Sequence, residues 1–191
     1  MQNTIRLLLF FLLIFLILIG GTVLWGIREY NKVVAMDERV KAQWQQVENQ
    51  LKRRYDLIPN LVETVKGYAK HERELFTYIA DARTKYFQAK DVKDKLQASE
   101  ALEGALSRLL LLVERYPELK ANESFLKLQD SLEGTENRIS VERRRYNEYV
   151  RELNTYRRTV FGRFFASLAG VDRAEYFEIP EHEKEPPKVR F

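Results

Sequence analysis

The chain has 191 residues with 32 lysines or arginines and 28 aspartates or glutamates, so its formal net charge is only +4. A charge balance this even, without a concentrated basic face, argues against a nucleic-acid-binding protein. The absence of cysteine excludes disulfide bonds, a thiolate nucleophile and a zinc–thiolate site. The 8 glycines form neither G-x-G-x-x-G nor G-x-x-x-x-G-K-[ST], which argues against a nucleotide-binding α/β domain.

A transmembrane helix is predicted over residues 7–27, because this stretch contains no charged residue. At about 1.5 Å rise per residue it spans roughly 30 Å, the thickness of a bilayer's hydrocarbon core. Trp25 lies near its end, where an indole ring can sit among headgroups. A cleaved signal peptide is the alternative, but the apolar run exceeds the usual core of about 7–15 residues and no A-x-A site follows. Basic residues are more frequent after this helix than before it, which favours a cytoplasmic domain.

Apolar residues recur every three or four positions from Val40 to Ile79, which is the spacing of one helix face. Pro59 interrupts this stretch, and two structures fit: one long kinked helix, or two helices with a corner between them. Proline suits the first turn of a new helix, and Asp56 just upstream is a candidate cap. We therefore expect a break with a corner at residues 56–60.

The next helix is predicted to start at a cap formed by Asp91 and to end before Pro117, which disfavours helical geometry at the preceding residue. Asn122 is a candidate cap for the last helix, whose stripe runs to Leu153 with heptad-like spacing. Beyond Gly170 the sequence becomes polar and proline-bearing.

These elements predict an all-α fold: an N-terminal transmembrane helix followed by an antiparallel up-and-down four-helix bundle of long, coiled-coil-like helices. The expected segments are a short N-terminal tail (1–6), the transmembrane helix (7–27), the helical bundle (28–170) and a polar C-terminal tail (171–191).

Two stretches carry a family resemblance: "WQQVENQLKRRYDLIPNLVETVKGYAKHE" (44–72) and "YPELKANESFLKLQDSLEGTENRISVERRRYNEYVRELN" (116–154). Together with the N-terminal anchor, they make the chain similar to the LemA family of bacterial membrane-anchored proteins. One departure is Phe161-Gly162, where the family usually has Phe-Pro. The final turn and the approach to "ASLAG" are therefore expected to differ.

The resemblance implies a single-pass protein of the bacterial inner membrane with a helical bundle and no established catalytic activity. A similar domain occurs in a magnetosome-membrane protein involved in membrane organisation. Family members are often encoded near membrane zinc metalloproteases of the HtpX type, which makes such a protease a candidate partner.

His71-Glu72 matches the first half of a zinc-protease signature, but Leu75 stands where a zincin needs its second histidine. The other histidine, His182, lies in the polar tail and is a poor ligand candidate. No Ser-His-Asp arrangement is evident, and abundant carboxylates on helices are usually solvated. We expect no enzyme activity, no metal and no cofactor.

Three surfaces are candidates for interactions. Turn residues near the two predicted far corners indicate a partner-docking tip, although capping and turn geometry alone can require them: Arg53, Arg54, Asp56, Pro59, Asn60, Arg115, Tyr116, Pro117 and Asn122. Basic and aromatic residues interleaved near the end of the last helix suit an anionic membrane surface, with core packing as the alternative: Arg157, Arg158, Phe161, Arg163, Phe164 and Phe165. An apolar run on most sides of its helix indicates self-association, or else deeper burial: Leu109, Leu110, Leu111 and Leu112.

The sequence thus favours a non-enzymatic scaffold that organises membrane-associated complexes, with the lipid bilayer and further copies of itself as partners and no nucleic acid. A membrane-remodelling or coat-forming protein is the first alternative. A protease accessory, or a metalloprotease, is the alternative from another class.

Overall fold

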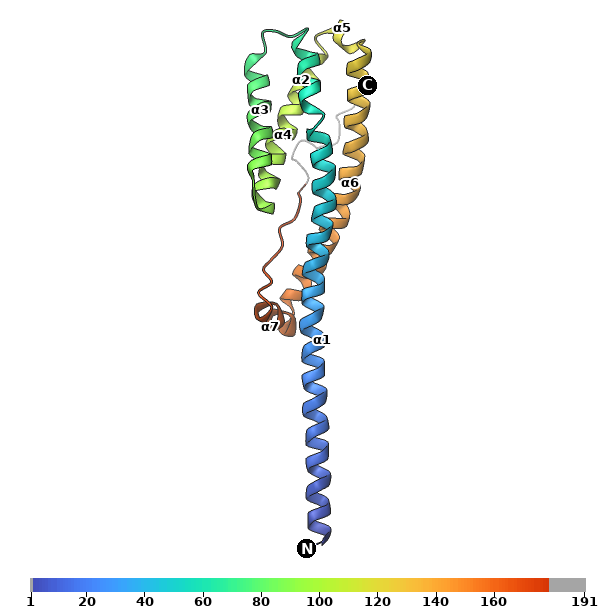
Figure 1. Cartoon of the computed structure of the whole chain (residues 1–191), viewed down its shortest axis with the longest axis vertical. Helices are drawn as coiled ribbons and strands as arrows, with labels where there is room; N and C mark the ends of the chain where they lie inside the picture. Colours follow the sequence, from blue (N-terminus) through green and yellow to red (C-terminus); the bar gives the residue numbers. More distant parts are fainter. Residues whose placement is uncertain (1, 179–191) are drawn as a thin grey trace, which may run out of the picture. The chain divides into compact units, whose positions relative to one another are not determined.

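The computed structural model describes residues 2–178, with side chains described from residue 5 onward. Within this range the protein is helical and contains no strand, which confirms the all-α prediction. The helices, drawn in Figure 1, are α1 (Gln2–Tyr55), α2 (Ile58–Lys66), α3 (Arg73–Gln88), α4 (Val92–Val113), α5 (Pro117–Lys120), α6 (Glu123–Arg158) and α7 (Val160–Leu168).

The chain divides into two compact units that share α1 and α6. The first unit comprises Met1–Ala42 and Glu148–Ala174, and the second comprises Gln43–Asn147 and Glu175–Phe191.

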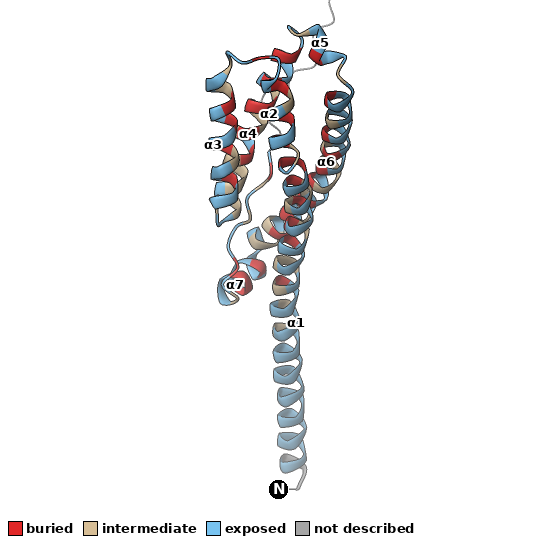
Figure 2. Cartoon of the chain, turned by 45° about the horizontal axis from the view of Figure 1, so that its top comes forward, coloured by how far each residue is buried: buried red, intermediate tan, exposed pale blue. Residues whose placement is uncertain are grey.

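In the first unit, every described side chain from Ile5 to Trp25 is exposed, as the pale blue of α1 shows in Figure 2. Among residues 2–178, α1 is the one helix long and apolar enough to cross a membrane. Further along the chain, the interior of the first unit consists of small and apolar residues of α1, α6 and α7: Val33, Val40, Val150, Leu153, Phe165 and Ala166.

The junction between α6 and α7 is a capped turn. Thr159 has an extended backbone, and its Oγ1 accepts a hydrogen bond of 3.0 Å from the backbone N–H of Gly162. After α7, Gly170 adopts φ +65°, a left-handed conformation that glycine reaches without a Cβ clash and that commonly ends helices. The short α7 is therefore defined at both ends by local chemistry.

In the second unit, α1 ends at Tyr55 and α2 begins at Ile58 with Pro59 in its first turn, so the expected helix break is present. The expected corner at residues 56–60 is wrong, because α2 continues in the direction of α1 (Figures 1 and 2). Backbone hydrogen bonds from Asp56 to the preceding turn and from Leu61 back to Leu57 carry the helix across the break. The chain reverses instead at residues 67–72, after which α3 runs back.

The predicted caps of the two later helices are confirmed. Asp91 accepts a hydrogen bond from the N–H of Asp94 at 2.8 Å, and Asn122 accepts one from the N–H of Phe125 at 3.0 Å. Asp56 does not cap α2, because its carboxylate accepts a hydrogen bond from Arg83 of α3 instead.

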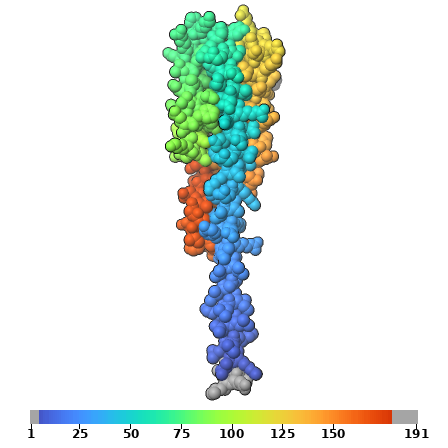
Figure 3. All heavy atoms as spheres, viewed as in Figure 1, coloured from blue at the N-terminus to red at the C-terminus, as the bar shows by residue number. Residues whose placement is uncertain are grey.

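The interior of the second unit receives side chains from α1, α2, α3, α4, α5 and α6. Most of the predicted stripe residues are buried there. The largest fully buried side chains of this unit are Tyr55, Tyr86, Tyr146, Phe125, Leu51, Ile58, Leu61, Ile79, Leu102, Leu106, Leu109 and Leu119. In the space-filling view of Figure 3, the atoms of α2 and α3 lie against one another without a visible gap. Burial of these apolar groups is the main source of stability for such a unit.

The sequence beyond Gly170 is only partly a polar tail. Residues 171–178 form neither a helix nor a strand, but Val171 and Phe177 are buried. Asn154 of α6 exchanges two hydrogen bonds with the backbone of Ala174, at 2.8 and 3.1 Å. Asn147 does the same with the backbone of Phe177, at 2.8 and 2.9 Å. This segment is therefore part of the folded structure, whereas residues 179–191, including His182, lie outside the described residues.

Candidate membrane-contact site

The short helix α7 carries an exposed apolar face. Val160, Phe161, Phe164 and Leu168 recur at helical spacing on that face and are all exposed, Phe164 to 63 %. The opposite side of α7 is buried through Gly162, Phe165 and Ala166. An apolar helix face without a protein partner marks a site of association, with a membrane or with another chain.

Trp25 connects this face to the apolar segment of α1. Its indole ring lies edge-on to Phe161 at 5.0 Å and to Phe165 at 5.7 Å between ring centroids. Gly26 follows, and a Cβ there would lie 3.9 Å from the Phe165 ring, which is an ordinary van der Waals distance, so the ring packs directly beside this position of α1. Because Trp25 stands near the end of the predicted transmembrane segment, α7 packs where that segment would leave the hydrocarbon core.

Three arginines lie close in sequence to these aromatic residues. Arg157 and Arg158 lie in the last turn of α6, and Arg163 lies on α7. None of the three forms an ion pair with any residue in the described range, and the Nε of Arg157 is buried without a hydrogen-bond partner. Guanidinium groups that form no ion pair within the protein can bind anionic headgroups, and each contributes about 1 kcal/mol to binding near a charged membrane surface.

The end of α6 is held on α1 by a polar contact beside this site. The Tyr156 hydroxyl donates to Glu29 at 2.7 Å, and the Lys32 ammonium lies 4.7 Å from the centroid of the Tyr156 ring. Burial, followed by the hydrogen bond to Glu29, raises the pKa of Tyr156 to about 12, so the phenol stays a proton donor. The contact fixes the point from which α7 departs.

The sequence-based candidates for membrane contact therefore lie together at the α6–α7 junction. One of them, Phe165, is buried against Trp25 and does not belong to the exposed face. Sequence reasoning missed Val160 and Leu168, which continue the spacing of Phe161 and Phe164, and it did not connect Trp25 with α7. The recurrence of apolar residues every three or four positions was the available signal.

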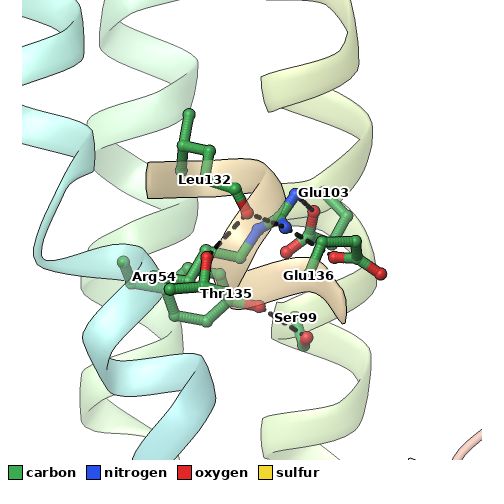
Figure 4. Close-up of polar contacts among 7 residues, drawn as sticks. Arg54, Ser99, Glu103, Leu132, Thr135 and Glu136 are labelled. Atoms are coloured by element: carbon green, nitrogen blue, oxygen red, sulfur yellow. Dashed lines mark hydrogen bonds and ion pairs between the residues drawn. The ribbon is translucent and has the colours of Figure 1, made fainter. Parts of the chain in front are cut away.

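The nine candidate tip residues do not form one cluster. Arg54 is buried, with 9 % of its surface exposed. It donates to Glu103 of α4 at 2.7 Å, to Glu136 of α6 at 2.5 Å and to the Leu132 carbonyl at 3.3 Å (Figure 4). Burial raises the pKa of the Glu103 carboxyl above its ordinary value, and the Arg54 guanidinium opposes that shift. Arg54 therefore ties three helices together inside the second unit.

A second buried contact lies beside Arg54. The hydroxyls of Tyr55 and Ser99 are hydrogen-bonded at 2.6 Å, and Ser99 is labelled in Figure 4. Sequence reasoning missed Ser99, Glu103 and Glu136, because acids and serines at helical spacing are ordinarily assigned to a solvated surface.

The other tip candidates fall into two groups. Asp56 accepts from Arg83 at 3.3 Å, near Pro59 and Asn60 in the first turn of α2. A different group surrounds the short α5, where Asn122 donates to the Tyr68 hydroxyl at 3.1 Å. The members of this α5 group are Arg115, Tyr116, Pro117 and Asn122. Arg53 belongs to neither group and is an exposed residue in the last turn of α1. The turn at residues 67–72, which the prediction left out, is thus the neighbour of the α5 group.

The four self-association candidates separate by burial. Leu109 and Leu112 are buried in the second unit, whereas Leu110 and Leu111 are exposed, Leu111 to 70 %. Within the described residues, no group of three or more histidine, aspartate or glutamate side chains is placed to hold a metal ion.

Comparison with known proteins places these features in a family. A model of the LemA family matches residues 43–191. The chain is 27 % identical over 175 residues to each of two proteins of Paramagnetospirillum magneticum named magnetosome protein MamQ 1 and MamQ 2, with 78 % of this chain and 64 % of each relative covered. It is 26 % identical over 181 residues to magnetosome protein MamQ of Magnetospirillum gryphiswaldense, with 81 % of this chain and 65 % of that relative covered. The chain thus spans less than two thirds of the length of these relatives.

Proposed function

The chain belongs to the LemA family, and on that premise we propose that it is a non-enzymatic, single-pass membrane protein that acts as a scaffold for membrane-associated complexes. The observation that carries this proposal is the exposed apolar face of α7, joined through Trp25 to the apolar segment of α1 and accompanied by arginines that form no ion pair with any residue up to 178. These features support attachment to the bilayer at two places.

The first attachment is residues 7–27 as a retained anchor in the bacterial inner membrane, with the helical units on the cytoplasmic side as the distribution of basic residues favours. The second is α7, lying in the plane of the membrane surface with its phenylalanines among the acyl chains and its arginines among the headgroups. Two attachments restrict the tilt of the protein, which a scaffold needs in order to present other surfaces in a fixed direction.

In this proposal, the helices of the second unit carry the surfaces to which other proteins bind. We interpret α1 with α2, α3, α4 and α6 as an antiparallel, up-and-down four-helix bundle with coiled-coil-like packing. Inside it, the buried Arg54 guanidinium pairs with the carboxylates of Glu103 and Glu136, which supports a structural role for these groups rather than acid–base catalysis. The proposed partners are further copies of the same chain and, by family resemblance, a membrane protease of the HtpX type.

A membrane-remodelling or coat-forming role is a second candidate, and one observation favours it. A helix with phenylalanines on one face and arginines beside them inserts into a single leaflet, and such insertion can bend a membrane. Deformation of liposomes by the full-length protein, absent after replacement of Phe161 and Phe164 by serine, would favour this role over a rigid scaffold.

Crosslinking in native membranes tests the scaffold proposal. A photo-activatable residue introduced at exposed positions of the full-length protein should capture a defined set of products, identified by mass spectrometry, that includes further copies of this chain. If neither a protein partner nor a second copy is captured from any exposed helix face, the scaffold proposal fails. Cleavage of an unfolded substrate by the purified protein with stoichiometric zinc would establish the metalloprotease alternative instead.

A further inference from the structure

An open groove runs between α3 and α4 in the second unit. These helices lie side by side and run in opposite directions (Figure 1), so the start of α3 and the end of α4 share one end of the hairpin. The apolar lining of the groove comes from Leu75, Leu111 and Leu112, together with the ring of Tyr78. Leu111 stands on its edge as the most exposed leucine of the second unit.

Charges of opposite sign occupy the two walls of this groove. Glu72 and Glu74 line the α3 wall, and Arg108 and Arg115 line the α4 wall. None of these four residues forms an ion pair with another residue in the described range, although Arg108 lies 5.9 Å from the centroid of the Tyr78 ring. The hairpin formed by α3 and α4 therefore has an acidic edge on the α3 side, an apolar centre and a basic edge on the α4 side.

From this arrangement we infer that the groove is a self-association surface, occupied by the same surface of a second copy of the chain. A two-fold axis parallel to α3 and α4 places the α3 wall of one copy against the α4 wall of the other. Acidic and basic edges then meet twice, because a two-fold interface repeats every contact. The same two-fold rotation directs the projecting Leu111 side chain of each copy into the groove of the other copy.

A second copy fits better than an unrelated partner because the surface is complementary to itself. A helix from another protein would need its own acidic and basic rows at matching spacing, whereas the second copy carries both by symmetry. Confinement to a membrane also raises the local concentration of copies relative to each other. The inference rests on the proposed scaffold function and names the surface through which copies would meet.

Cysteine crosslinking tests the surface directly, because the natural chain contains no cysteine. Full-length Leu111→Cys protein in native membranes should form a covalent dimer with a short bis-maleimide. Leu126→Cys, at an exposed leucine of α6, is the matched control and should remain monomeric. Equal crosslinking at both positions, or crosslinking at Leu126 alone, would overturn the inference.

Charge reversal adds a test that misfolding cannot imitate. In the Leu111→Cys background, Glu74→Arg or Arg115→Glu alone should reduce the dimer about tenfold, since each substitution places like charges together at two symmetric contacts. The double variant exchanges the signs of facing charges and should restore dimer formation. Failure of that restoration, with both single variants folded by circular dichroism, would refute the proposed pairing.

The scaffold proposal and this surface can fail separately. If an amine-reactive crosslinker captures oligomers of the natural chain while Leu111→Cys gives no dimer, the surface is wrong and the scaffold proposal stands. If neither reagent captures a second copy, self-association itself is wrong and this inference falls with it.

Discussion

Replacement of Arg54 by methionine should destabilise the second unit by about 3 kcal/mol, the lower part of the range for breaking a buried ion pair. Arg54 is 9 % exposed and donates to Glu103, Glu136 and the Leu132 carbonyl. Most of the loss comes from Glu103, which would remain buried without its counter-charge. Glu136 contributes less, because about a third of its side chain is exposed to solvent.

The penalty of Arg54→Met should depend on pH in a defined direction. Burial raises the pKa of Glu103 in the folded state, and loss of the opposing guanidinium raises it further. A carboxyl with a raised folded-state pKa destabilises the protein as pH rises through that pKa, because the unfolded chain ionises first. Below the ordinary carboxyl pKa of 4.5 both states are protonated and the Glu103 contribution disappears. The penalty should therefore be smaller near about pH 5 than near about pH 7.5.

Urea unfolding of the full-length protein in detergent micelles, followed by circular dichroism, measures these quantities. The double variant Arg54→Met/Glu103→Gln should recover much of the loss, because no buried carboxylate remains. Arg151→Met is the matched control and should cost no more than about 0.5 kcal/mol, since Arg151 is largely exposed in a long ion pair with Glu148. A penalty below about 1 kcal/mol, or one that grows as pH falls, would refute the reasoning.

Further predictions concern α7 and the segment after it. Gly162→Ala should displace α7, because a Cβ there would come within 1.9 Å of the Tyr156 carbonyl oxygen, and trypsin should then cleave faster at Arg158 and Arg163. Gly134→Ala, whose Cβ would meet nothing within 4 Å, should leave the digestion pattern unchanged. Asn154→Ala removes both hydrogen bonds to Ala174 and should accelerate amide hydrogen exchange there by at least tenfold, whereas unchanged exchange would show that the contact does not hold the segment. Replacement of Arg157, Arg158 and Arg163 by glutamine should remove any preference of α7 for anionic over zwitterionic lipid, at about 1 kcal/mol per arginine, as measured by lipid quenching of an α7 label in nanodiscs of each composition.

The parts of the fold that follow from neighbouring residues could be predicted from the sequence. The caps at Asp91 and Asn122 depend on hydrogen bonds three residues along the chain, and the buried stripes depend on helical spacing alone. The family resemblance is likewise confirmed by the match over residues 43–191.

Features that depend on distant residues could not be predicted in this way. Arg54 and Glu136 are 82 positions apart, so an arginine that belongs to the interior was assigned to a solvated tip. Pro59 identifies the start of a helix but not the direction of that helix, which the packing of α2 on its neighbours decides. Periodicity placed Phe165 with Phe161 and Phe164, but in the structure the Phe165 ring is buried while the other two rings are exposed. Trp25 contacts both Phe161 and Phe165, so burial of one ring depends on how α7 packs and not on spacing along the sequence.

The depth of Phe164 in the bilayer tests the central claim most directly. Phe164→Cys in the otherwise cysteine-free, full-length protein can carry an environment-sensitive fluorophore in liposomes of anionic lipid, with Arg151→Cys on the exposed surface of α6 as the matched control. The proposed membrane contact predicts blue-shifted emission and strong quenching by doxyl-labelled lipid at position 164, with neither effect at position 151. Emission at position 164 that is as red-shifted and as insensitive to the lipid quencher as at position 151 would contradict it.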